Sequence, residues 1–337
     1  MSIFHSGSSD DAKAEDAPQT WIVTDGAVGM EAQGKAVAEA VGLSYTLKRV
    51  RPSGPMRLIP TPFQLLIPAS WRLVAAQSSS GLTPPWPRLV ISIGRRSVPI
   101  ALAVKQLGGA YALHIQNPKV PASLFDLIAA PVHDDFEGEN VVTTFGAVHN
   151  VTPRRLAEAR ERFAPRIADL PHPRIAVLLG GDSRAFKFPL KTAVAFGAML
   201  ASLARETGGA LLITPSRRTS PETLKALADE VKDTPHFVWD GTGDNPYYAF
   251  LSLADAIVVT EDSVNMVTEA AGTGKPVYIQ SLPGRSARLA RFHRLMRERG
   301  ATRPFKGKLE AWRYDPVNDT EHVAALIRKA LRLESKR

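Results

Sequence analysis

The strongest constraint on the fold is an alternation of short β-branched runs with helical patterns, which starts twice along the chain. WIVT (21–24) is typical of a first strand, and a glycine turn and a helix over 31–41 follow it. RIAVLLGG (174–181) starts the pattern again and precedes a helix over 189–206. Further strands are expected at 45–50, 88–92, 110–116, 125–130 and 140–145, and then at 211–214, 236–239, 256–259 and 277–279. Strands separated by helices predict parallel sheets covered by helices. The fold class is therefore α/β, with two doubly wound, Rossmann-like halves.

The segment FAPRIADLPHP (163–173) carries three prolines and marks the expected boundary between the halves. A chain of 337 residues suggests about two domains. We expect a disordered polar tail over 1–18, an N-terminal domain over 19–168 and a C-terminal domain over 169–318. The last segment, 319–337, is expected to hold a helix with an apolar face.

Composition excludes several classes of protein. Apolar residues make up 44% of the chain and charged residues 22%, which suits a folded protein with sizeable cores. With no cysteine, disulfides and thiolate metal sites are excluded. Residues 1–18 contain no apolar run of the signal-peptide kind, and no stretch approaches the ~20 apolar residues that span a bilayer. We expect a cytoplasmic protein without a transmembrane segment, and peripheral membrane contact stays open.

The formal net charge of +9 is unevenly distributed. Residues 284–308 hold seven Arg and two Lys against one Glu, a net charge of +8. On this count the rest of the chain is a near-neutral body, and an anionic partner is expected at this segment. Its arginines recur every three residues and drift around a helix without an aromatic platform, so no nucleic-acid partner is expected.

Each half opens with a strand that leads into a glycine turn and a helix. Such turns present unpaired N–H groups to an anion, although many are only tight connections. The first turn contains Asp25, Gly26 and Gly29, and the second contains Gly180, Gly181, Ser183 and Arg184. Their spacing matches neither a dinucleotide nor a P-loop motif.

Further candidates follow the later strands of the second half. Arg217 and Arg218 come directly after a strand, where arginines bind phosphate or carboxylate, or form a solvated loop. Asp262 or Ser263 is expected to cap the next helix. Glu269 stands near the end of that helix, where the dipole disfavours it, so it needs a function or a partner such as Lys275.

In the first half, His114 and Gln116 end a strand and either orient a polar ligand or serve the core. A run of His133, Asp134 and Asp135 lacks a third ligand at a useful spacing, so no metal site is expected.

These motifs resemble those of the GT-B glycosyltransferases, which bind a nucleotide-sugar on the second of two facing Rossmann-like domains without a required metal. Glu269, Gly274 and Pro276 are similar to the donor motif of that superfamily, and HIQN (114–117) and GGDS (180–183) resemble two of its loops. The resemblance implies that Glu269 holds the ribose and that the C-terminal helix crosses back to the first domain. It also implies Asp25 or Glu31 as the catalytic base, Gly26, Gly29, His114 and Gln116 on the acceptor side, and no cofactor beyond a nucleoside diphosphate-sugar substrate.

A closer resemblance covers about residues 20–330. TPSRRT (214–219) and TEDSVNMVTEA (260–270), with WIVTDGAVGMEAQ (21–33), are similar to the plant mitochondrial fission family and its bacterial relatives. This family implies a different function, a non-catalytic adaptor that recruits a protein partner, dynamin-like in plants. The chain departs from the transferases in three places: the first glycine turn lacks their histidine, Ile115 replaces their strand-end glutamate, and QSLPGRS (280–286) replaces the residues that contact the donor sugar. Nucleotide binding is thus better supported than sugar transfer.

Overall fold

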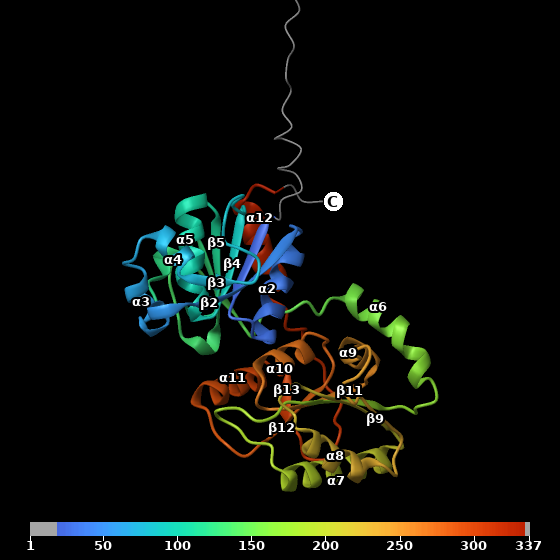
Figure 1. Cartoon of the computed structure of the whole chain (residues 1–337). Coiled ribbons are helices and arrows are strands. Elements are labelled where there is room, and N and C mark those ends of the chain that lie inside the picture. Colours follow the sequence, from blue (N-terminus) through green and yellow to red (C-terminus); the bar gives the residue numbers. More distant parts are fainter. Residues whose placement is uncertain (1–18, 334–337) are drawn as a thin grey trace, which may run out of the picture. The chain divides into compact units, whose positions relative to one another are not determined.

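The computed structural model describes residues 19–333, so the tail expected over 1–18 lies outside the described residues. The chain divides into a first unit, Met1–Thr144 with Thr320–Arg337, and a second unit, Phe145–Asp319. Each unit contains its own largely parallel sheet (Figure 1). The two sheets are the two Rossmann-like halves that the sequence pattern predicts.

The first sheet has the order β3-β2-β1-β4-β5-β6-β7, and only β3 runs antiparallel to its neighbour. Its strands are β1 (Thr20–Thr24), β2 (Tyr45–Pro52), β3 (Ala76–Ser78), β4 (Leu89–Ile93), β5 (Tyr111–Ile115), β6 (Leu127–Pro131) and β7 (Val141–Thr144). The central strands β1 and β4 are buried along their whole length, as expected for a sheet covered on both faces. The sequence pattern missed β3 because three residues with an exposed glutamine make no apolar run.

Helices and short turns complete the first unit. They are α2 (Val28–Val41), α3 (Thr61–Gln64), α4 (Ala69–Val74), α5 (Val98–Gly108) and α12 (Thr320–Ala330), with 3₁₀ turns η1 (Gly54–Leu58), η2 (Arg95–Ser97), η3 (Ala122–Leu124) and η4 (Val132–Asp134). The last helix, α12, packs against α2 and buries Val323 and Ile327 completely. Arg328 fixes this contact by donating to the carbonyl of Ala40 at 2.5 Å. The C-terminal segment is therefore part of the first unit.

The second sheet has the order β10-β9-β8-β11-β12-β13 and is parallel throughout. Its strands are β8 (Arg174–Leu179), β9 (Ala210–Pro215), β10 (His236–Val238), β11 (Ala256–Thr260), β12 (Val277–Gln280) and β13 (Thr302–Pro304). Its helices are α6 (Pro153–Phe163), α7 (Leu190–Thr207), α8 (Pro221–Val231), α9 (Tyr247–Leu253), α10 (Val264–Ala271) and α11 (Ala287–Glu298), with η5 (Ala164–Ile167) after α6. Helices α7 and α8 cover one face of this sheet, and α9, α10 and α11 cover the other (Figure 1).

The boundary between the units differs from the expected one at residue 168. Helix α6 belongs to the second unit, because Phe163 packs edge-on against Phe237 and Phe250, with ring centroids 5.3 and 5.5 Å away. The chain therefore changes units at residue 145, before α6. The prolines of 163–173 mark a connection inside the second unit.

In each sheet the strand order reverses beside the first strand of the unit: between β1 and β4 in the first sheet, and between β8 and β11 in the second. In doubly wound sheets, ligands bind at the carboxyl ends of the strands that flank such a switch point. The glycine turns after β1 and β8 lie at these two places. The topology thus predicts that a ligand binds at the carboxyl edge of each sheet.

Candidate functional site

In the second unit, three segments meet at the turn that follows β8. Gly180 donates its N–H to Thr260 Oγ1 at 2.7 Å, and Gly181 donates to Asp262 Oδ2 at 3.1 Å. A Cβ on Gly180 would lie 2.1 Å from Asp262 Oδ1, and one on Gly181 would lie 1.9 Å from the Arg218 carbonyl oxygen. Only glycine fits at both positions, since the neighbours approach too closely for any side chain.

The carboxylate of Asp262 is the anion at the centre of this junction. Its side chain is fully buried and lies 2.6 Å from Nη2 of Arg218. It also accepts from the Thr260 hydroxyl at 2.7 Å, in addition to the N–H of Gly181. The N–H groups of the glycine turn, Asp262 and Arg218, which were expected to bind a phosphate, therefore bind one another instead. The chain's own carboxylate and hydroxyl occupy the two glycine N–H groups, and Asp262 is an internal counter-ion.

The loop after β9 brings arginines to the same edge. Thr219 donates its hydroxyl to the carbonyl of Leu179 at 3.1 Å and also contacts that of Gly180, so this loop is tied to the glycine turn. Arg217 and Arg184 are exposed and have no hydrogen-bond or ion-pair partner within the described part of the chain. The arginine loop, the glycine turn and the start of α10 therefore meet at one edge of the second sheet. Arg184 and Arg217 are free cations on the loops that meet there.

The two serines of the predicted site have local structural roles. Ser263 caps α10 by accepting from the N–H of Met266 at 3.4 Å. Ser183 accepts from the N–H groups of Ala185 and Phe186 at 3.2 and 3.0 Å and so closes the turn after β8. Both hydroxyls stabilise the backbone geometry that presents the arginines.

Glu269 lies on the last turn of α10 and is bound to a tyrosine. Tyr247, at the start of α9, donates its hydroxyl to Glu269 Oε2 at 2.6 Å. Burial raises the pKa of the Glu269 carboxyl to about 7, against the opposing effects of this hydrogen bond and of the charge of Arg155. The group is therefore near its titration point at neutral pH, which is the behaviour expected of functional carboxyls.

Lys275, the simplest partner for Glu269 in the sequence, binds elsewhere. Its Nζ donates to the carbonyls of Leu251 and Ser252 at 2.8 and 2.6 Å, at the C-terminal end of α9. Burial lowers the pKa of Lys275 to about 8. Glu269 is thus not the ordinary surface glutamate of a lysine pair. Tyr247 was not among the predicted site residues, because its position at the start of an apolar helix in NPYYAF gives no local signal of this contact.

In the first unit, the turn after β1 borders a cavity of about 300 Å³. The cavity is lined by Asp25, Gly26, Arg49, Arg51, Gln77, Ser78 and Ser79. Asp25 accepts from the N–H of Ala27 at 3.3 Å and lies 3.8 Å from the Arg96 guanidinium. Gly26 has a φ of 92°, a left-handed value that favours glycine at this turn, and Gly29 follows in the first turn of α2.

Two predicted residues of the first unit are engaged inside the fold. Glu31 accepts two bonds from Arg49, from Nε at 2.7 Å and from Nη2 at 3.0 Å, so it is a poor candidate for a base. His114 is fully buried between Ser92 Oγ, at 2.7 Å from Nδ1, and the ring of Phe125. Burial lowers its pKa to about 3, so the ring is neutral. The acceptor-side role of His114 is therefore wrong, and its core role is correct.

Gln116, two residues later, has a φ of 80° and donates its N–H to the carbonyl of Ala129 at 2.8 Å. This bond holds the end of β5 against β6. Its side chain is partly exposed, so the acceptor-side role of Gln116 stays a prediction.

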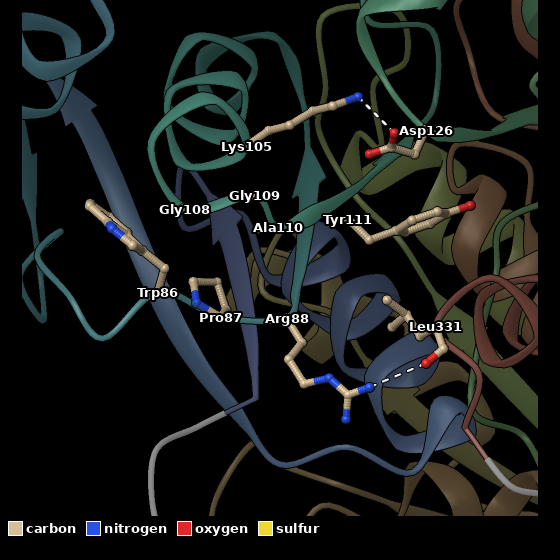
Figure 2. A pocket seen from close by; sticks show the side chains of 10 residues that line it. All are labelled: Trp86, Pro87, Arg88, Lys105, Gly108, Gly109, Ala110, Tyr111, Asp126 and Leu331. Carbon is tan, nitrogen blue, oxygen red and sulfur yellow. Dashed lines mark hydrogen bonds and ion pairs between the residues drawn. The ribbon is translucent and has the colours of Figure 1, made fainter. Parts of the chain in front are cut away.

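A larger cavity, of about 550 Å³, lies at the opposite, amino edge of the first sheet, beside the starts of β4 and β5. Figure 2 shows two of its polar groups already paired: Lys105 with Asp126 at 2.8 Å, and Arg88 with the carbonyl of Leu331 at 3.2 Å. These pairs join the sheet to neighbouring segments. We therefore place the candidate site at the carboxyl edges, where the free cations lie, and not in the larger cavity.

Known structures show the same type of fold. MurG of Acinetobacter baumannii has a TM-score of 0.54 at 17% identity, over 93% of this chain and 100% of that one. UDP-GlcNAc 2-epimerase of Methanocaldococcus jannaschii has a TM-score of 0.55 at 12% identity, over 93% and 99% of the two chains. At such low identity these likenesses show the fold alone. The protein has the GT-B-like fold that the motifs imply.

Relatives in sequence identify the family. Mitochondrial fission protein ELM1 of Arabidopsis thaliana is 30% identical over 274 residues, which is 73% of this chain and 64% of that protein. The chain thus spans less than two thirds of the length of the plant relative. An uncharacterized protein of Rickettsia prowazekii, RP120, is 27% identical over 290 residues, 73% of this chain and 80% of that protein. The model of the mitochondrial fission ELM1 family matches residues 28–331, and the chain therefore belongs to that family.

Proposed function

We propose that this protein binds a nucleoside diphosphate, free or joined to a sugar, at the carboxyl edge of the second sheet. The main support is Glu269, a carboxyl with a raised pKa that belongs to the same unit as two unpaired arginines at the strand ends. In this proposal Arg184 and Arg217 bind the diphosphate, because guanidinium groups form bidentate bonds to phosphate oxygens. Glu269 accepts hydrogen bonds from ribose hydroxyls.

The separation along α10 suits a nucleotide. Glu269 follows the N-cap Ser263 by six residues, which at ~1.5 Å per residue is ~9 Å along the helix. This is of the order of the span between a ribose and its second phosphate. Structural neighbours bind such ligands: S. aureus MnaA, with a TM-score of 0.54, is known in a structure with UDP. Uridine diphosphate is therefore the first ligand to test.

Sugar transfer is the catalytic form of this proposal. It needs a base for the acceptor hydroxyl, and Glu31 is occupied by its two bonds to Arg49. Asp25 borders the cavity of the first unit and would accept that proton. The cations at the second unit would stabilise the charge that develops on the departing diphosphate.

Calorimetry with uridine diphosphate and with inorganic pyrophosphate tests the binding site. Glu269→Gln should weaken uridine diphosphate binding by about tenfold to a hundredfold, the equivalent of one bond to a charged group, and leave pyrophosphate binding nearly unchanged. Arg217→Ala should weaken both. Glu206→Gln and Lys225→Ala, on exposed faces of α7 and α8, are matched controls. Equal losses for both ligands in Glu269→Gln, or no binding by the wild type, would contradict the assignment.

The engagement of Glu31, together with QSLPGRS at 280–286, favours a second function, a non-catalytic adaptor that keeps the nucleotide site. A sugar-release assay with UDP-sugars separates the two functions. An adaptor binds the nucleotide without releasing sugar, and Asp25→Asn then has no effect. A transferase releases sugar and loses most of its turnover in Asp25→Asn, with binding preserved.

A further inference from the structure

The most exposed large apolar side chains of the described residues lie together in the first unit. Within the 17 residues from Leu58 to Val74, between β2 and β3, five such side chains are exposed: Leu58 79%, Phe63 61%, Leu66 81%, Trp71 70% and Val74 84%. We call them the 58–74 surface. The next most exposed, Leu190, stands at 52%. Single exposed apolar residues are ordinary, but a group of five including Trp and Phe calls for a binding partner.

Two polar side chains of this segment are buried beside the apolar Met56 and Leu73. Gln64 is 7% exposed and Arg72 is 3% exposed, although each directly follows an exposed aromatic residue in its helix. The amide of Gln64 donates to the carbonyls of Met56 and Ile59 at 3.2 and 2.7 Å. Polar side chains thus hold the segment from inside while apolar ones face outward.

The base of the segment is firmly attached. Arg72 donates to the carbonyl of Pro99 at 2.9 Å, on α5, and Ser53 donates its N–H to the carbonyl of Ala75 at 2.8 Å. Helices α3 and α4 follow each other in the chain, and both contact α5. Helix α4 presents Trp71 and Val74 outward as an i, i+3 pair, and Phe63 of α3 is exposed together with Leu66, two residues beyond the end of α3. The exposed side chains therefore belong to an ordered surface.

The stretch of sequence that contains this surface carries cations but no carboxylate side chain. Residues 40–125 contain ten Lys and Arg and not one Asp or Glu. Arg51, Arg57 and Arg95 are exposed, and their side chains have no hydrogen-bond or ion-pair partner among residues 19–333. Arg96 lines a small cavity together with Pro52, Met56 and Gln64, so it stands next to the segment. The part of the chain outside 284–308 is near neutral in its sum, as counted, but this sum conceals separate basic and acidic stretches.

We propose that the 58–74 surface docks the protein onto an anionic lipid bilayer, with its apolar side chains in the interface and its arginines at the headgroups. Trp, Phe and Leu beside unpaired arginines are the composition of interfacial membrane sites. Side chains exposed by 61–84% stand out from the surface, which suits insertion between headgroups. The described chain has no helix long and apolar enough to cross a bilayer, so the attachment is peripheral.

Co-sedimentation of the full chain with vesicles tests this proposal. The protein should bind phosphatidylcholine vesicles that contain phosphatidylglycerol and bind pure phosphatidylcholine only weakly. Leu66→Ser with Trp71→Ser should reduce the partition coefficient roughly tenfold or more. Leu190→Ser with Val194→Ser, two exposed positions on α7, is the matched control and should leave binding unchanged. Thermal unfolding should confirm that both double variants remain folded.

A charge variant separates this surface from the basic segment 284–308. Arg57→Glu should lower binding to the anionic vesicles by at least about fivefold, because the attraction of one cation to an anionic surface strengthens binding by about that factor. Arg294→Glu, on α11, should have little effect. The reverse order of effects would overturn the proposal in favour of the basic segment.

Tryptophan fluorescence provides a direct readout of insertion. Anionic vesicles should shift the emission of the wild type to the blue, and Trp71→Phe should retain binding but lose this shift. Three results would overturn the proposal: no vesicle binding by the wild type, a blue shift that persists in Trp71→Phe, or a dimer in free solution that Leu66→Ser dissociates. The last result would assign the surface to a second copy of the chain.

Discussion

At Glu269, one carboxyl group couples stability to pH. Its folded-state pKa of about 7 lies above the ordinary value of 4.5, so folding favours the protonated form. Its contribution to stability is fully present below about pH 4.5 and is lost as the pH rises through 7. Relative to Glu269→Gln, we expect the free energy of unfolding of the wild type to fall by on the order of 2 kcal/mol from pH 4.5 to 8, a value reduced for partial exposure. Urea titrations at a series of pH values measure it, and parallel profiles for the two proteins would contradict it.

The same pKa predicts pH-dependent ligand binding. Ribose hydroxyls donate best to an ionised carboxylate, so uridine diphosphate should bind more tightly above pH 7 than at pH 6. The phosphates themselves titrate in this range. Inorganic pyrophosphate serves as the control, and only the excess pH dependence of uridine diphosphate is assigned to Glu269. That excess should vanish in Glu269→Gln.

At the scale of elements, Asp262 joins the turn after β8, the end of β11 and the loop after β9. Asp262→Ala should destabilise the second unit by about 2 kcal/mol or more, because it leaves Arg218 and the N–H of Gly181 without their acceptor. Arg218→Ala should cost less, since Asp262 then keeps the bonds from Thr260 and Gly181. Chemical denaturation compares the two, and a larger loss in Arg218→Ala would show that this order of importance is wrong.

Most of the strands could be predicted from the sequence, because buried parallel strands are continuous apolar runs. The runs at 174–181 and 256–259 contain β8 and β11 with small differences at the ends. The strands β3 and β13 were missed because AQS and TRP contain no apolar run, whereas β10, which is equally short, was predicted from HFVW. The hydrogen bond between Tyr247 and Glu269 spans 22 residues and depends on the packing of α9 beside α10, which no local pattern contains.

The charge of the 58–74 neighbourhood could have been found in the sequence. A search for dense basic runs detects 284–308, but the region 40–125 is distinguished by its lack of Asp and Glu. Its cations are spaced widely and come together through β2, η1 and η2. The exposure of Phe63 and Trp71 could not be found, since an apolar residue in the sequence is normally assigned to the core.

At the scale of the whole molecule, two units with separate cores predict separable unfolding. Uridine diphosphate at 100 times its Kd should stabilise only the second unit, by about 2.7 kcal/mol. Trp21, Trp71 and Trp86 report on the first unit, and Trp239 and Trp312 on the second. Phe substitutions at all tryptophans of one unit leave only the fluorescence of the other unit, so ligand-induced shifts in unfolding are assigned to a unit. An equal shift in both units would mean that they unfold as one.

The contact of α12 with α2 also fixes an order of events during synthesis. The first unit is completed by residues from Thr320 onward, whereas the second unit is complete at Asp319. A ribosome therefore releases every residue of the second unit before α12 emerges to cover α2. The second unit, although it comes later along the chain, is therefore the first that can finish folding. Until α12 has emerged, the first unit keeps one flank of α2 uncovered.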